Sequence, residues 1–163
     1  MSVNVRNAAA DDRAWIGEWL SRHFASPRIV SRGILHQADM LPGLVAMDGA
    51  APVGLLLYDR RGDECEVVVL IAAREGQGVA TALLEAAQVM ARDAGCRRLW
   101  LTTTNDNAAA IAFYERRGWT TAAIRRGAMA EARKLKPELP EFGHGGVPIR
   151  DEIEFELRIA PRA

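Results

Sequence analysis

The order of hydrophobic and polar positions divides this chain into short segments with two different periods. Segments with apolar residues three or four apart predict helices, and segments with alternating or unbroken apolar residues predict strands. In chain order we expect a strand over 3–8, a helix over 13–24, a short helical stretch over 31–40, strands over 44–47, 53–58 and 65–72, a helix over 79–94, a strand over 98–103, a helix over 108–117, a strand over 119–124, a helix over 127–136 and a strand over 153–159. This succession predicts an α/β fold with a mixed sheet and helices on both faces.

The strand order follows from three local signals. Residues 67–72 are apolar at every position, which indicates a strand covered on both faces and therefore central in its sheet. The strands over 44–47, 53–58 and 65–72 follow one another through short turns that contain glycine, so we expect them to be antiparallel. The strand over 98–103 comes after a helix, and such a crossover makes it parallel to the central strand. We expect one domain, residues 1–163, with a central parallel pair.

Composition and charge mainly exclude function classes. The 163 residues include 21 basic and 21 acidic side chains, and this neutral balance argues against nucleic acid or an anionic membrane as a partner. Cys65 and Cys96 have neither metal-ligand spacing nor a disulfide pattern, so we interpret them as apolar residues in a reducing compartment. No segment has the length of a membrane span or the apolar stretch of a signal peptide. We therefore expect a cytoplasmic protein without a metal.

A glycine-rich turn, Glu75-Gly76-Gln77-Gly78, stands between the central strand and the helix over 79–94. Such a turn presents unpaired backbone N–H groups at the positive end of a helix dipole, which is a binding place for phosphate. No Gly-Lys-Ser/Thr follows, and the next strand ends in threonines rather than in an acidic ribose ligand. A P-loop and a dinucleotide fingerprint are thus both poor matches, and a purely structural turn stays open.

A second motif lies one strand later. The segment Asn107-Ala108-Ala109-Ala110-Ile111-Ala112-Phe113-Tyr114-Glu115-Arg116-Arg117-Gly118-Trp119 resembles the second motif of the GNAT superfamily of acyl-CoA-dependent N-acyltransferases. In that motif an Asn is followed seven residues later by a Tyr, and then by a Gly and an aromatic residue that start the next strand. Glu75-Gly76-Gln77-Gly78-Val79-Ala80 is similar to the first motif, Arg/Gln-x-x-Gly-x-Gly/Ala, in all but its first position. The resemblance covers about residues 52–124.

The resemblance implies a GNAT-like fold and acetyl-CoA as co-substrate, with pantetheine between the two parallel strands. It implies that Asn107 contacts the pantetheine, that Tyr114 protonates the departing thiolate, and that a backbone N–H near Leu70 or Ile71 meets the oxyanion. The pyrophosphate would be held by backbone N–H groups of Gln77, Gly78, Val79, Ala80 and Thr81. A phenol suits the role of the acid, because its pKa of about 10 keeps it protonated at pH 7.

The spacing of residues supports this transfer. Asn107 and Tyr114 are two helical turns apart, so they share a face about 10 Å apart along the axis, and the small Ala110 lies between them. Tyr114 as a plain core aromatic is the structural alternative.

A base is also needed, because an ammonium group must lose a proton before its nitrogen attacks a thioester. Glu66 matches the glutamate that is the base in histone-acetylating members, and we expect it to be buried beside Val68 and Leu70. Glu64 lies on the same strand face and is a substitute. Two solvated carboxylates at the start of the strand are an equally good interpretation.

Two charged features depart from the family pattern or stay ambiguous. Glu75 stands where Arg or Gln is usual, which is unfavourable near a pyrophosphate, and Arg74 either reaches the phosphates or pairs with Glu75.

The basic residues of the segment before the last strand form either a lid for an anionic substrate group or a solvated helix face, and we favour the latter. These residues are Arg125, Arg126, Arg133, Lys134 and Lys136.

Two further expectations concern the acceptor side and the last strand. His36 and Asp39 lie where acceptor-binding segments occur in the superfamily. The last strand alternates Ile153 with Glu154 and Glu156, so one of its faces should be in water.

The hypothesis is an N-acetyltransferase that moves an acetyl group to a primary amine by direct attack in a ternary complex. Cys65 should face away from Glu66, so no cysteine is placed to carry the acetyl group. The acceptor would be a small-molecule amine or a peptide amine, and a homodimer is left open. Alternatives are a non-catalytic acyl-CoA-binding sensor domain, which Glu75 favours, and a nucleotide-binding protein with the same glycine turn.

Overall fold

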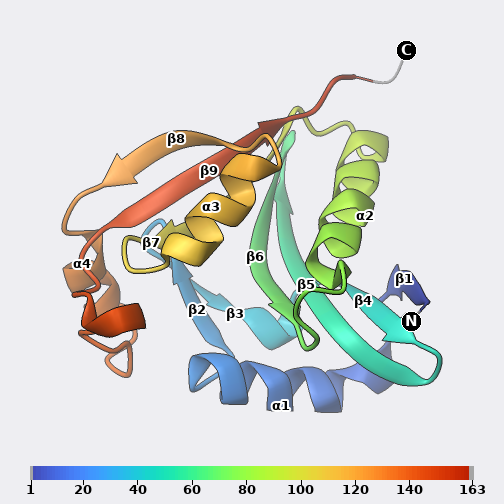
Figure 1. The fold of residues 1–163 in the computed structure, drawn as a ribbon, viewed down its shortest axis with the longest axis horizontal. Coiled ribbons are helices and arrows are strands. Elements are labelled where there is room, and N and C mark those ends of the chain that lie inside the picture. Colours follow the sequence, from blue (N-terminus) through green and yellow to red (C-terminus); the bar gives the residue numbers. More distant parts are fainter. Residues whose placement is uncertain (1, 162–163) are drawn as a thin grey trace.

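A seven-stranded mixed sheet organises the structure, a computed structural model that describes residues 2–161 (Figure 1). The elements are β1 (Val3–Asn7), α1 (Arg13–Phe24), β2 (Arg28–Ser31), β3 (Ile34–Gln37), β4 (Gly43–Asp48), β5 (Ala51–Arg61), β6 (Glu64–Ala72), α2 (Val79–Asp93), β7 (Arg98–Thr104), α3 (Ala108–Arg116), β8 (Thr120–Arg125), α4 (Ala128–Leu135) and β9 (Glu152–Arg158), with short 3-10 turns over Ala10–Asp12, Ala38–Met40 and His144–Gly146. The mixed α/β fold expected from the sequence is confirmed.

The strand order is β1-β4-β5-β6-β7-β9-β8, with a separate β2–β3 hairpin. β6 and β7 pair in parallel, and the other neighbours in the large sheet are antiparallel. β6 is therefore in the middle of the sheet, as its unbroken apolar run predicted. The C-terminal strand β9 inserts between β7 and β8, an order that no local pattern in the sequence indicated.

Helices cover both faces of the sheet (Figure 1). α2 and α3 pack on one face with a core that includes Leu83, Leu99 and Phe155. α1 packs on the other face, where Ile16 and Leu20 are fully buried against β4, β5 and β6. No helix among residues 2–161 is long and apolar enough to cross a membrane.

The expected helical stretch over 31–40 is wrong. Residues 28–37 form the hairpin of β2 and β3, and only Ala38–Met40 make a 3-10 turn. The hairpin turns at Arg32-Gly33, where the φ angles are 50° and 73°, and two consecutive left-handed residues match the twist of a two-residue hairpin. Arg-Gly is a weaker hairpin signal than Asn-Gly, which is why the sequence pattern missed it.

Candidate active site

The two parallel strands separate in the middle of the sheet. β6 and β7 pair only between residues 64–66 and 98–100, and the last pair is Glu66 with Trp100. A cavity of about 240 Å³ lies where they diverge, and its lining comes from both strands, α3 and the end of α1: Phe24, Val67, Val68, Leu70, Leu101, Thr102, Thr103, Asn107, Ala110 and Tyr114. Because the edge of β6 has no strand partner there, its backbone groups can bind an extended ligand that carries amides. We call this cavity the gap.

A β-bulge in β6 shapes the gap. On β5, Leu57 pairs with Val69 and Tyr58 pairs with Val67, so Val68 is the extra residue. The bulge reverses the faces: Val67 packs in the α2 core, whereas Val69 packs in the α1 core. Glu66 was expected to lie beside Val68 and Leu70, but Leu70 packs on the α2 side and only Val68 packs on the α1 side. A strict alternation along the strand would place Val68 and Leu70 on one face, and the unbroken apolar run contains no sign of the bulge that separates them.

The glycine turn forms a second cavity at the start of α2. Gly76 and Gly78 have φ angles of 72° and 75°, and the first helical hydrogen bond runs from the Ala82 N–H to the Gly78 carbonyl. The N–H groups of Val79, Ala80 and Thr81 therefore have no partner within the helix. The cavity measures about 370 Å³ and is lined by Ala72, Arg74, Glu75, Gly76, Gly78, Val79, Ala80, Thr81, Phe113 and Arg117. Of the five residues expected around a pyrophosphate, all but Gln77 line this cavity.

Arginines supply the charge near this turn. Arg74 pairs with Asp48, at 2.6 Å between Nη1 and Oδ2, a partner that the sequence did not indicate. Arg117 donates from Nε to the Thr81 hydroxyl at 3.0 Å, and its guanidinium carbon lies 3.5 Å from the centroid of the Phe113 ring. Sequence reasoning missed Arg117, although its position three residues after Tyr114 was available as a signal. It places a positive charge in the wall of the cavity that Glu75 also lines.

Asn107, Ala110 and Tyr114 lie together on the wall of the gap, as their helical spacing predicted. The Asn107 side chain accepts a hydrogen bond from the Ala110 N–H at 3.2 Å, so it also caps α3. Tyr114 is 8% exposed and packs against the rings of Trp119 and Phe155. Burial raises the pKa of Tyr114 to about 12, which keeps its hydroxyl protonated at neutral pH.

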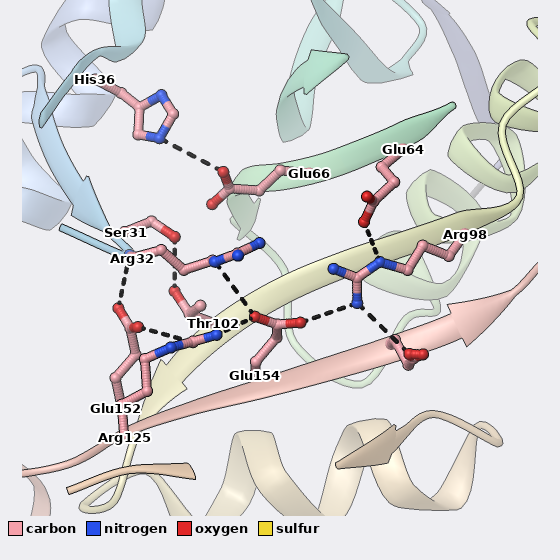
Figure 2. Close-up of polar contacts among 11 residues, drawn as sticks. Ser31, Arg32, His36, Glu64, Glu66, Arg98, Thr102, Arg125, Glu152 and Glu154 are labelled. Carbon is pink, nitrogen blue, oxygen red and sulfur yellow. Dashed lines mark hydrogen bonds and ion pairs between the residues drawn. The ribbon is translucent and has the colours of Figure 1, made fainter. Parts of the chain in front are cut away.

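Glu66 lies at the point where the strands separate, on the face opposite α2. It is 4% exposed, and its Oε1 is 3.5 Å from Nε2 of His36, a side chain of β3 (Figure 2). Its Oε2 is buried without a hydrogen-bond partner among residues 2–161. Glu64, the expected substitute, is occupied by ion pairs with Arg97 and Arg98. Of the two carboxylates, Glu66 alone has an oxygen without a partner among the described residues.

The two residues expected on the acceptor side have different places. His36 is buried between two carboxylates. Its Nδ1 lies 3.8 Å from Oδ2 of Asp59, and its Nε2 faces Glu66. Asp39 instead accepts a hydrogen bond from the Gln37 side chain at 2.7 Å, outside this cluster.

The last strand does not have a wet face. Glu152, Glu154 and Glu156 are all buried, although their alternation indicated contact with water. Arg98 and Arg125 neutralise them: Glu154 accepts from Arg98 Nη1 at 2.9 Å and from Arg125 Nη2 at 2.7 Å (Figure 2). Burial by itself would raise the pKa of Glu154, but the hydrogen bonds from Arg125 and Arg98 outweigh it and hold that pKa below its usual range.

The basic segment before the last strand is not one solvated face, which corrects the expectation. Lys136 is 2% exposed and donates from Nζ to the Phe24 carbonyl at 2.7 Å. Burial lowers the pKa of Lys136. Arg133 donates to the Ile149 carbonyl at 2.8 Å, and only Lys134 makes an exposed ion pair, with Glu131. Lys136 therefore fastens the end of α4 to the end of α1.

A third cavity, which we call the acceptor cavity, opens beside Glu66. It measures about 290 Å³ and is lined by Arg32, Ile34, Asp59, Arg61, Glu64, Glu66 and Trp100. It lies next to the gap, because Glu66 and Trp100 are the last strand pair and the following residues, Val67 and Leu101, line the gap. Within residues 2–161, no three His, Cys, Asp or Glu side chains are grouped as a metal site requires.

The sequence and the fold are similar to those of known proteins. Residues 8–119 match the model of the Acetyltransferase (GNAT) family. The Bacillus subtilis protein YdhI is 38% identical over 139 residues, which are 85% of this chain and 87% of that protein. The ribosomal-protein-S18-alanine N-acetyltransferase from Escherichia coli has the same fold, with a TM-score of 0.72, 20% identity, and coverage of 99% of this chain and 97% of that one. A GNAT family acetyltransferase from Elizabethkingia anophelis, solved with acetyl-CoA bound, gives a TM-score of 0.70 at 14% identity, covering 96% of this chain and 98% of that one.

Proposed function

This chain belongs to the acetyltransferase (GNAT) family, and from that premise we propose that it transfers the acetyl group of acetyl-CoA to a primary amine. One observation carries the proposal: the gap between two parallel strands lies between two features. The unpaired N–H groups at the start of α2, which we call the phosphate cradle, lie beyond one end, and the buried carboxylate of Glu66, with one unpartnered oxygen, lies at the other. The amine would be that of a small molecule or of a peptide.

Acetyl-CoA would lie along β6. Pantetheine would occupy the gap, with its amides against the free edge of β6 and against Asn107. The pyrophosphate would meet the unpaired N–H groups of Val79, Ala80 and Thr81, next to Gly78 and Gln77. Arg117 would provide the positive charge that Glu75 does not. The E. anophelis structure supports this choice of cofactor, because it holds acetyl-CoA in the same fold.

Transfer would proceed by direct attack. Glu66 accepts a proton from the substrate ammonium, and the freed nitrogen attacks the thioester carbonyl. A backbone N–H near Leu70 or Ile71 stabilises the oxyanion. When the carbon–sulfur bond breaks, the Tyr114 hydroxyl acts as the acid toward the sulfur.

A covalent acetyl-cysteine has no support in the structure. Cys65 is fully buried in the α2 core, on the face away from Glu66. Burial raises the pKa of the Cys65 thiol to about 12, so it is not a thiolate at neutral pH. Both cysteines are free, which agrees with the reducing cytoplasm that we propose as the location.

Calorimetry with acetyl-CoA, followed by thiol-release assays over a panel of amines, tests the proposal. We expect saturable binding of acetyl-CoA and CoA release that depends on the amine. Glu75 favours a second candidate, a non-catalytic acyl-CoA sensor, and binding without turnover on any amine would support it. Competition by ATP or NAD in place of CoA would instead indicate a nucleotide-binding protein. No binding at millimolar acetyl-CoA would refute both CoA-based candidates.

A further inference from the structure

The acceptor cavity contains one carboxylate that makes no ion pair with an arginine. Three carboxylates line it, but Asp59 accepts a hydrogen bond from an arginine of its own strand at 2.8 Å, and Glu64 pairs with Arg98. Glu66 has only His36, at 3.5 Å, and its Oε2 is buried without a hydrogen-bond partner among residues 2–161. A buried carboxylate oxygen with no partner is costly, so an ammonium group gains most at this atom.

Two arginines line the same cavity. Arg61 is bonded through its Nε to Asp59 and its side chain is 65% exposed, whereas Arg32 is held against the wall of the cavity. The guanidinium carbon of Arg32 lies 4.7 Å from the centroid of the Trp100 ring, and its Nε is 3.6 Å from Oε1 of Glu154. Its two terminal nitrogens make no hydrogen bond to the described residues 2–161, and Figure 2 shows the side chain reaching from the β2–β3 turn toward β7. Arg32 therefore presents a free fork of donors, which suits a carboxylate.

Backbone geometry holds Arg32 in this position. Its φ angle is 50°, in the left-handed region that costs energy for a residue other than glycine. Its backbone N–H donates to Oε2 of Glu152 at 3.1 Å, and the neighbouring Ser31 hydroxyl lies 3.2 Å from that of Thr102. These contacts attach the hairpin turn to β9 and β7, so the arginine lies over the Trp100 ring at the wall of the cavity, with 41% of its side chain exposed.

From these two groups we propose that the acceptor is a small zwitterion, an amine that also carries a carboxylate, as an amino acid does. Its ammonium binds at Glu66 and its carboxylate binds at Arg32. This inference rests on the proposed acetyl transfer and adds the charge pattern of the acceptor. A diamine would need a second carboxylate, and the two others in the lining, Asp59 and Glu64, are each already paired with an arginine. The volume of about 290 Å³ is at the small end of ligand sites, which suits a small molecule.

The test compares matched acceptors at saturating acetyl-CoA by CoA release. Each set contains an amino acid, its primary amide and the amine without the carboxylate, such as leucine, leucinamide and 3-methylbutylamine, together with alanine, β-alanine and 4-aminobutyrate to vary the chain. We expect kcat/KM for the preferred amino acid to exceed that of its amide and its amine by at least about 10-fold, because a charge-assisted pair is lost without the carboxylate.

Variants assign the preference to Arg32. Arg32→Gln should raise KM for the amino acid by about 10- to 100-fold with little change in kcat, and leave KM for the amide unchanged. Arg32→Lys keeps the positive charge but not the forked donor geometry, so its KM for the amino acid should lie between those of the wild type and Arg32→Gln. Arg60→Gln is the matched control, since Arg60 is exposed on the same strand as Asp59 and donates to the Ala94 carbonyl outside the cavity. Thermal melts confirm that each variant is folded.

Binding separates this inference from the proposed function. Amino acids are titrated against the protein saturated with CoA, and the shift in melting temperature is measured. Equal or faster acetylation of the amides and amines overturns the zwitterion inference and leaves acetyl transfer supported. Binding of amino acids that is lost in Arg32→Gln, without turnover of any amine, supports the zwitterion site and overturns the transferase. If no amino acid binds and no amine is acetylated, both the zwitterion inference and the proposed acetyl transfer are overturned.

Discussion

Replacing Tyr114 with phenylalanine should lower kcat by about 10- to 100-fold and leave the fold intact. The change removes one hydroxyl from a ring whose centroid lies 5.3, 5.6 and 5.9 Å from the rings of Phe113, Trp119 and Phe155. Those ring contacts remain in phenylalanine. The hydroxyl makes no hydrogen bond to the described residues 2–161 and lines the gap, so its loss should cost less than about 1 kcal/mol of unfolding free energy.

The pKa of the phenol sets the size of the rate effect. Burial raises the pKa of Tyr114 from 10.0 to about 12, whereas an ordinary thiol has a pKa of about 8.5. Complete proton transfer from this phenol to an ordinary thiolate is therefore uphill. The hydroxyl contributes mainly by donating a hydrogen bond to the sulfur as charge develops there. A hydrogen bond to a charged group is worth about 1.5 to 3 kcal/mol, which corresponds to the stated fall in kcat.

The assay measures CoA release at saturating acetyl-CoA and amine. Tyr58→Phe is the matched control, because Tyr58 is the other of the two tyrosines and packs against the α2 core from β5. It should keep the wild-type kcat. Both variants should unfold with a free energy within about 1 kcal/mol of the wild-type value, as thermal melts measure. A kcat within twofold of wild type in folded Tyr114→Phe would refute the acid role. A fall beyond about 1,000-fold would instead show full proton transfer in the transition state.

Three further predictions follow from the site and its supports. Glu66→Gln should lower kcat/KM by about 100- to 10,000-fold in the CoA-release assay; a kcat/KM within a fewfold of wild type in the folded variant would point to a different base. Arg117→Gln should weaken acetyl-CoA about 5- to 10-fold in low-salt calorimetry, an effect that shrinks at high salt, whereas Arg116→Gln should not. The hydrogen bond from Arg6 holds the pKa of Asp12 well below its usual range, so this pair stabilises the fold above about pH 4 and the stabilisation is lost as pH falls further. Asp12→Asn should therefore lower the melting temperature at pH 7, and the difference from wild type should narrow in acid.

Local sequence determined most of the elements and which of their residues share a face. The apolar run of β6, the glycines before α2, and the spacing of Asn107 and Tyr114 depend on periods of two and 3.6 residues. These periods assign residues to faces without knowledge of distant contacts. The resemblance to the family named the residues expected around acetyl-CoA, and all of them but Ile71 and Gln77 line the gap or the cavity at the start of α2.

Only the tertiary structure decided the acceptor half. The bulge at Val68 turns Leu70 away from Glu66, and a one-residue bulge leaves no trace in an unbroken apolar run. The insertion of β9 between β7 and β8 buries glutamates that alternation had placed in water, because arginines from other strands neutralise them. Arg32 meets Glu152 across 120 positions of sequence, and Lys136 meets Phe24 across 112. Pairings over such separations arise from the packing of whole elements, so periodicity could assign residues to faces but could not indicate the charges that line the acceptor cavity.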